Sequence, residues 1–271
     1  MDCEARHAPA DSPRPRADPA TVTTRNGLAA DNRRRANGNH GVKRFDALLI
    51  DFDGVLRRWP DDDHLLEAAH GLPPGSLRRT AFAPELRDEA LLGRISDEQW
   101  RERIAHDLQR AYPHSAAEQA VMRWSAAVGE LDSEVLALLD ACRPELRRVL
   151  VSNATSRLPR DLQALGLAQR FHAVVNSSEL GHAKPDSYCL LAALAYAGVE
   201  AGHALFVDDD AANVAAAMAL GAHGHHYREP AGLRQWLEEA GALCLDAQTP
   251  IWRTGERSAS NDDDERSQRQ R

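Results

Sequence analysis

Pairs of aspartates follow two apolar runs of the sequence, at the point where each run ends. They are Asp51 and Asp53 after the run 47–50, and Asp208 and Asp209 after the run 204–207. Carboxylates gathered in one place repel each other unless a cation lies between them, and clusters of oxygen ligands suit Mg²⁺. These aspartates therefore predict Mg²⁺ as a cofactor, provided that the fold brings the two strand ends together.

Other polar residues with a chemical use stand near the ends of further segments. Ser152 and Asn153 follow the apolar run 148–151, and the hydroxyl of Ser152 is able to donate a hydrogen bond to an anionic oxygen. Lys184 precedes Pro185, a residue type favoured at the first position of a helix. We therefore expect Lys184 at a helix N-terminus, where anions bind.

The spacing of the first aspartate pair suits catalysis. Asp51 and Asp53 are two residues apart, so their side chains point the same way in an extended segment. One carboxylate could attack an electrophile while the other transfers protons. An aspartate nucleophile with Mg²⁺, a lysine and a hydroxyl donor predicts phosphoryl transfer through an aspartyl-phosphate.

The apolar runs predict strands of a parallel sheet, because they are short, continuous and separated by helical segments. The predicted strands are 47–50, 148–151, 173–175, 204–207 and, more weakly, 222–227. The predicted helices between and after them are 159–165, 185–197, 211–220 and 231–240, each followed by a glycine. This alternation predicts an α/β fold with a Rossmann-like, doubly wound parallel sheet, in which the carboxyl ends of the strands line one crevice.

One long segment, 56–146, interrupts the alternation and contains no predicted strand. Its predicted helices are 84–92, 96–110, 115–128 and 132–142, and the second of them starts with a capping box of Ser96 and Gln99. We therefore predict an inserted all-helical cap domain. The predicted boundaries are 58–142 for the cap, 43–57 and 143–252 for the α/β core, and 1–42 and 253–271 for disordered polar tails.

The overall composition argues against several classes of protein. The chain has 271 residues, a net charge of −8 and 43% hydrophobic residues, and no apolar run approaches the ~20 residues of a membrane span. The start of the chain lacks the pattern of a secretory signal, and the four cysteines form no CxxC pair. We expect a cytoplasmic protein, a monomer or homodimer, that binds neither nucleic acid nor membranes.

Four motifs in order resemble those of the haloacid dehalogenase-like (HAD) superfamily. They are DFDGVL at 51–56, VSN at 151–153, AKPD at 183–186 and VDDDAANV at 207–214. Each motif follows a predicted strand or precedes a predicted helix, and the helical insertion follows the first strand. The resemblance covers about residues 45–240 and is to the subfamily whose cap is a helical bundle. The segment GRISDEQW at 93–100 is similar to a helix start common in these caps.

The resemblance implies a catalytic role for five residues. Asp51 would be the nucleophile, and Asp53 would be the general acid and base. Ser152, Asn153 and Lys184 would bind the phosphate of the substrate. The implied activity is a Mg²⁺-dependent phosphatase that acts on a small phosphorylated metabolite.

The resemblance also implies the ligands of the metal. Asp51 and Asp209 would bind Mg²⁺ through their side chains, Asp53 through its backbone carbonyl and Asp208 through a water molecule. Asn213 stands where many members carry another acid, and the variant with Asn also occurs in the family.

Three alternatives to a phosphatase stay open at this point. A phosphomutase needs the same core residues and differs in its cap. A haloacid dehalogenase also uses an aspartate nucleophile, but it needs neither Mg²⁺ nor a second acid. A non-catalytic HAD-like binding module usually lacks a catalytic residue, whereas every position is filled in this sequence.

Two other groups of residues admit more than one interpretation. His223, His225 and His226 resemble metal ligands, but their place at the weakest predicted strand favours a peripheral role. The segment 57–59 (RRW) follows the first motif, where it could contact an anionic substrate or belong to a solvated linker.

Overall fold

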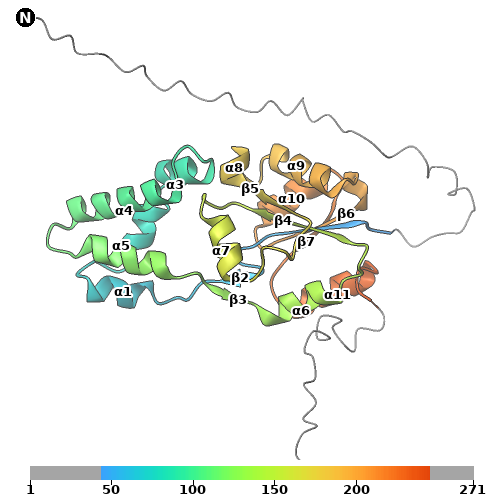
Figure 1. Cartoon of the computed structure of the whole chain (residues 1–271), viewed down its shortest axis with the longest axis horizontal. Coiled ribbons are helices and arrows are strands. Elements are labelled where there is room, and N and C mark those ends of the chain that lie inside the picture. Colours follow the sequence, from blue (N-terminus) through green and yellow to red (C-terminus); the bar gives the residue numbers. More distant parts are fainter. Residues whose placement is uncertain (1–43, 245–271) are drawn as a thin grey trace, which may run out of the picture. The chain divides into compact units, whose positions relative to one another are not determined.

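The computed structural model describes residues 44–244, so the predicted tails at 1–42 and 253–271 lie outside the described residues. A five-stranded parallel sheet with the order β5-β4-β1-β6-β7 forms the centre of the fold (Figure 1). Its strands are β1 (Ala47–Ile50), β4 (Arg147–Ser152), β5 (Ala173–Asn176), β6 (Ala204–Asp208) and β7 (His223–His226). All five predicted strands are present, and each bound lies within one residue of its prediction.

Helices cover both faces of this sheet (Figure 1). One face carries α6 (Ser133–Ala141), α7 (Leu158–Ala164) and α11 (Pro230–Glu239), and the other carries α9 (Ser187–Ala197) and α10 (Ala211–Ala219). A short helix, α8 (Ser177–Leu180), follows β5, and a 3₁₀ turn, η2 (Ala201–His203), precedes β6.

The strand β1 shows why its sequence is apolar throughout. Leu48 and Ile50 contact the first helical layer, whereas Ala47 and Leu49 contact the second. A strand buried on both faces needs apolar residues at every position, not at alternate ones. The predicted doubly wound α/β fold is therefore confirmed.

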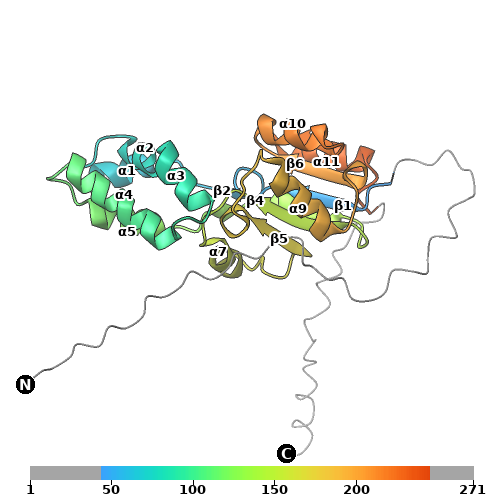
Figure 2. The same ribbon diagram turned by 90° about the horizontal axis from the view of Figure 1, so that it is seen from above.

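The inserted cap is a separate group of helices beside the sheet, as Figures 1 and 2 show. Its helices are α1 (Asp63–Ala69), α2 (Ser76–Ala81), α3 (Pro84–Leu91), α4 (Asp97–Ala111) and α5 (Ala117–Ala126). They enclose an apolar core of their own, in which Leu77, Ile104 and Leu108 are fully buried. The predicted capping box is present, since Ser96 and Gln99 exchange backbone-to-side-chain hydrogen bonds at the start of α4. Within residues 44–244, no helix is long and apolar enough to cross a membrane.

The end of the cap differs from the predicted boundary at residue 142. The helix α6 packs against α11, and its residues Val135, Leu138 and Leu139 belong to the apolar core of the sheet. The helices of the cap therefore end with α5. A second difference is a short antiparallel pair, β2 (Arg57–Arg58) and β3 (Glu130–Leu131), where the chain leaves and re-enters the core.

The start of α9 is also later than predicted. The helix begins at Ser187, because the side chain of Asp186 accepts a hydrogen bond from the backbone N–H of Tyr188 and caps the first turn there. Pro185 therefore lies in the preceding turn, after a cis peptide bond, and is not the first helical residue. Lys184 reaches the site from this turn.

Candidate active site

The register of the sheet brings residues that are far apart in the sequence to one edge. The strand β1 lies between β4 and β6, with Ile50 opposite both Leu150 and Val207. The backbone N–H of Asp51 donates to the carbonyl of Val207 at 3.0 Å. Asp51 and Asp208 consequently follow neighbouring strand ends at the carboxyl edge of the sheet, as the sequence predicted.

Three carboxylates and one ammonium group meet at this edge. Side-chain oxygens of Asp51, Asp208 and Asp209 all lie within 4.8 Å of one another. The ammonium nitrogen of Lys184 lies 2.7 Å from Oδ1 of Asp51 and 2.7 Å from Oδ2 of Asp208. The lysine side chain is almost completely buried, so this positive charge belongs to the site.

The electrostatics of this cluster fit a divalent cation. Burial, together with the charge of Asp208, raises the pKa of Asp51 to about 7, against the opposing effect of Lys184. Burial and the charge of Asp208 also raise the pKa of Asp209. The charges of Asp51 and Asp208 raise the pKa of Lys184, although burial opposes this. The single ammonium group therefore does not balance the charge of the three carboxylates. A cation such as Mg²⁺ would supply the missing positive charge.

The carboxylate of Asp208 accepts three hydrogen bonds from the chain itself. Its Oδ2 accepts from Lys184, and its Oδ1 accepts from the amide of Asn213 and from the backbone N–H of Asp210, both at 2.9 Å. An acid at position 213 would repel Asp208, whereas the amide donates to it. This arrangement holds Lys184 in place and makes Asp208 a poor direct ligand.

Asp51 and Asp209 are more open to a metal ion. Oδ1 of Asp51 accepts from the backbone of Phe52 at 2.6 Å and contacts Lys184, while Oδ2 accepts no hydrogen bond from residues 44–244. Gly54 has a φ of +87°, and a Cβ added there would lie 2.1 Å from Oδ2 of Asp209. The glycine therefore allows the carboxylate of Asp209 to approach the first motif closely.

Asp53 points away from this cluster, toward the cap. Its Oδ1 accepts hydrogen bonds from Nε of Arg57 and from the indole Nε1 of Trp59, both at 2.7 Å. Its Oδ2 accepts from the second guanidinium nitrogen of Arg57 at 2.9 Å. Asp53 is thus separate from the cluster of Asp51, Asp208 and Asp209.

Arg57 connects the first motif with a second carboxylate. Its guanidinium lies 2.7 Å from Oδ2 of Asp161 in α7, and Arg157 contacts the other oxygen of Asp161 at 2.7 Å. Arg157 also donates to the backbone carbonyls of Ser125 and Ala127, at the end of α5. This network joins the loop of the first motif to the segment through which the chain returns from the cap.

The predicted phosphate-binding residues differ from one another in what they contact. The side chain of Asn153 donates to the carbonyl of Lys184 at 2.8 Å and accepts from its N–H at 2.7 Å, so it positions the turn that carries the lysine. The predicted contact of Asn153 with the phosphate stays a prediction. Ser152 is the last residue of β4 and is buried beside Asn176 of β5.

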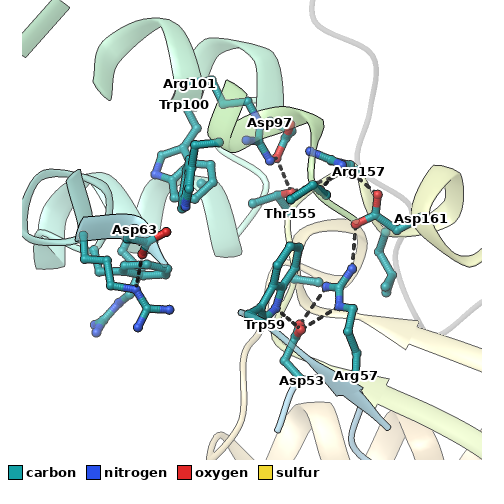
Figure 3. A pocket seen from close by; sticks show the side chains of 18 of the residues that line it. Asp53, Arg57, Trp59, Asp63, Asp97, Trp100, Arg101, Thr155, Arg157 and Asp161 are labelled. Atoms are coloured by element: carbon teal, nitrogen blue, oxygen red, sulfur yellow. Dashed lines mark hydrogen bonds and ion pairs between the residues drawn. The ribbon is translucent and has the colours of Figure 1, made fainter. Parts of the chain in front are cut away.

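A pocket of about 550 Å³ opens between the core and the cap, next to Asp53 (Figure 3). Its core wall includes Arg57, Trp59 and Asn153, and its cap wall includes Trp100 and Trp124. Such a volume suits a small molecule. The pocket gives access to Asp53 of the first motif from the side of the cap.

The structure distinguishes between the interpretations of the arginines after the first motif and of the three histidines. Arg57 is buried and paired with Asp53, whereas Arg58 is exposed and pairs with Asp132. His223 and His225 both stack on the ring of Trp236, and the ring nitrogen Nε2 of His226 contacts the carbonyl of Asp209. Packing therefore accounts for the first two histidines.

Sequence reasoning missed Asp97, which joins the cap to the core. Its carboxylate accepts from the hydroxyl of Thr155 at 2.7 Å, and its backbone N–H donates to the hydroxyl of Ser156 at 2.9 Å. The only signal in the sequence was the capping box at the start of α4, which marks a helix end and predicts no contact with the core.

The haloacid dehalogenase-like hydrolase family matches residues 45–221 of the chain. This match covers more than half of the chain and includes the first, second, third and fourth motifs together with the inserted cap. The protein therefore belongs to the haloacid dehalogenase-like hydrolases. It is an enzyme of the hydrolase class.

Solved structures of this family share the fold. A HAD family enzyme from Bacteroides thetaiotaomicron matches with a TM-score of 0.55 and 17% identity, over 69% of this chain and 95% of the other. A predicted HAD-like hydrolase from Porphyromonas gingivalis matches with a TM-score of 0.53 and 24% identity, over 67% and 90%. An L-2-haloacid dehalogenase matches with a TM-score of 0.53 and 19% identity, over 66% and 82%.

Proposed function

We propose that this hydrolase is a Mg²⁺-dependent phosphatase, which cleaves a small phosphorylated metabolite through an aspartyl-phosphate on Asp51. One observation carries the proposal: the buried nucleophile shares Lys184 with Asp208 and lies within reach of the carboxylate of Asp209. This excess of negative charge would repel an anionic phosphate unless a cation is bound. When bound, Mg²⁺ would neutralise charge on the phosphoryl oxygens.

The first half of the reaction uses both aspartates of the first motif. Oδ2 of Asp51 attacks phosphorus, and the bond between phosphorus and the leaving oxygen breaks. Asp53 delivers a proton to that oxygen, and Lys184 offsets the negative charge on the transferring group. The products of this step are the free alcohol and the aspartyl-phosphate.

The second half regenerates the enzyme. Asp53, now ionised, takes a proton from a water molecule while the oxygen of that water attacks phosphorus. The bond between Asp51 and phosphorus breaks, and inorganic phosphate leaves. In the structure Asp53 accepts three hydrogen bonds from Arg57 and Trp59, two at Oδ1 and one at Oδ2.

A fold neighbour lends support to the choice of ligands. The HAD family enzyme of Bacteroides thetaiotaomicron has also been crystallised in complex with magnesium and inorganic phosphate. These are the cofactor and the product proposed for this chain. The dehalogenase among the neighbours shares the fold, but dehalogenation gives no use to the acidic cluster of Asp208 and Asp209 or to Asp53.

Hydrolysis of an aryl phosphate tests the proposal. The assay compares the wild type with Mg²⁺, the wild type with EDTA and the Asp51→Asn variant, and a parallel assay measures halide release from 2-chloropropionate. We expect phosphate release that needs both Mg²⁺ and Asp51. Halide release without metal would contradict the proposal and establish a dehalogenase. Phosphoryl transfer between two positions of a sugar phosphate, without phosphate release, would establish a mutase.

A further inference from the structure

The indole of Trp59 is held in one orientation beside the acid and base. Its Nε1 donates to Oδ1 of Asp53 at 2.7 Å, which fixes the edge of the ring. The guanidinium carbon of Arg57 lies 4.4 Å from the ring centroid, which covers one face. Despite these two contacts, Trp59 is 40% exposed. This apolar residue lines the pocket.

Arg57 is itself immobilised, so the orientation of Trp59 is a stable feature. The guanidinium carbon lies over two rings, 4.2 Å from the centroid of buried Phe52 and 4.4 Å from that of Trp59. It also forms ion pairs with Asp53 and Asp161. A guanidinium that is stacked and paired in its plane has little freedom to rotate. The exposed face of Trp59 is therefore the one that is turned away from Arg57, and Figure 3 shows the indole on the pocket side of Arg57.

We propose that this free face of Trp59 binds an aromatic ring in the leaving group, so that the substrate is a phosphomonoester of an aryl or arylmethyl alcohol. The inference rests on the proposed function, because that function places the leaving oxygen at Asp53. Trp59 donates to the same carboxylate, so a group bonded to the leaving oxygen lies next to the indole. A ring attached to this oxygen directly or through one carbon would lie beside the indole.

The opposite wall of the pocket suits the same class of ligand. Trp100, Trp124 and Phe82 lie against one another there, with ring centroids 5.6 to 6.4 Å apart. The guanidinium of Arg101 lies over the rings of Trp100 and Trp124. Charged side chains, among them Asp63, Arg87 and Arg123, also line the pocket, so the expected preference for an aromatic ring rests on the free face of Trp59 and on the exposed ring of Phe82.

A matched pair of substrates tests the inference. Benzyl phosphate and cyclohexylmethyl phosphate have leaving groups of similar size and basicity and differ in the aromatic ring. We expect the wild type to favour benzyl phosphate by about three- to tenfold in kcat/KM, the range typical of one aromatic contact. The Trp59→Leu variant should lose this preference, and Trp59→Phe should keep most of it.

The ratio of the two substrates isolates the stacking contact. Replacing Trp59 also removes a hydrogen bond to Asp53, but this loss affects both substrates equally and cancels in the ratio. Trp236→Leu, in a tryptophan that stacks on His223 and His225 and does not line the pocket, serves as the control and should keep the preference. A preference unchanged in Trp59→Leu would overturn the inference.

Binding measurements separate this inference from the proposed function. Calorimetry with the Asp51→Asn variant and Mg²⁺ measures the affinity for both phosphates without turnover. Equal affinities would overturn the aromatic site, whatever the wild type hydrolyses. Tighter binding of benzyl phosphate, lost in the Asp51→Asn/Trp59→Leu double variant, would support the site. If the wild type then hydrolysed neither ester, the proposed function would fail while the aromatic site stood.

Discussion

The ammonium group of Lys184 lies 2.7 Å from Oδ1 of Asp51, in direct contact with the carboxylate that is proposed to attack phosphorus. The same nitrogen lies 2.7 Å from Asp208, so one buried cation serves two buried carboxylates. The lysine thereby keeps two negative charges together in the absence of metal. It leaves the third, on Asp209, without a balancing charge in the cluster.

Replacing Lys184 by methionine should have opposite effects on catalysis and on metal binding. We expect kcat to fall by about a hundredfold or more, because a preorganised cation is lost. The free energy of unfolding without metal should fall by about 3–5 kcal/mol at pH 8, because two buried carboxylates lose their partner. The affinity for Mg²⁺ should rise, because the site becomes more negative.

Urea denaturation with and without Mg²⁺, together with calorimetry, measures these effects. Arg234→Met is the control, since Arg234 is exposed on α11, and it should change none of the three quantities. Weaker Mg²⁺ binding in Lys184→Met would contradict the electrostatic account of the cluster.

Gly54→Ala should disturb the metal site through Asp209. The new Cβ would lie 2.1 Å from Oδ2 of Asp209, and the carboxylate has to move away. We expect the affinity for Mg²⁺ to fall by about 10- to 100-fold, as for other changes that displace a ligand. Isothermal titration calorimetry measures this change.

A second glycine controls for backbone strain. Gly166 has a φ of +71°, and a Cβ added there would meet nothing within 4 Å. Gly166→Ala should therefore cost about 1–2 kcal/mol of stability without affecting Mg²⁺. Equal losses of affinity in the two variants would show that strain, rather than the contact with Asp209, is responsible.

The binding of Mg²⁺ should depend on pH through Asp51. With a pKa of about 7 in the metal-free enzyme, Asp51 is protonated at lower pH, and Mg²⁺ must displace that proton. The affinity should rise about tenfold per pH unit below pH 7 and level off above it. Titrations between pH 5.5 and 8.5 test this, and Asp51→Asn should flatten the curve. An affinity that stays constant across this range in the wild type would refute the raised pKa.

Asn153→Ala should impair catalysis without removing a metal ligand. The variant loses both hydrogen bonds to the backbone of Lys184, so the ammonium group is less well positioned. We expect kcat to fall by about tenfold and the free energy of unfolding by about 1–3 kcal/mol, with the affinity for Mg²⁺ unchanged. Steady-state kinetics and calorimetry on the same preparation check this. Unchanged kcat would mean that the turn holds Lys184 without Asn153.

The sequence predicted the central strands well because their apolar pattern has a single physical cause. The run 204–207 is apolar throughout because β6 is buried on both faces, so no tertiary detail is needed to recognise it. The rule that carboxyl ends of parallel strands meet at one edge then placed Asp51 beside Asp208. Helix α2 was missed, because six residues that include two arginines carry too little periodicity.

The parts of the site that were not predictable depend on contacts between distant residues. Arg57 pairs with Asp161, which lies more than a hundred positions further along the chain, and nothing local distinguishes it from Arg58. Likewise, the reciprocal hydrogen bonds of Asn153 form only when the turn of Lys184 lies against β4. Such pairs require the three-dimensional structure, since a single sequence carries no record of them.

The central claim is that Asp51 carries the phosphoryl group during turnover. Mass spectrometry tests it directly, on peptides from enzyme that is mixed with an aryl phosphate and Mg²⁺ and quenched in acid within one turnover. We predict the mass of one phosphoryl group on the peptide that contains Asp51, lost on treatment with hydroxylamine and absent in EDTA or in Asp51→Asn. Phosphate release by Asp51→Asn at the wild-type rate, without this adduct, would contradict the account.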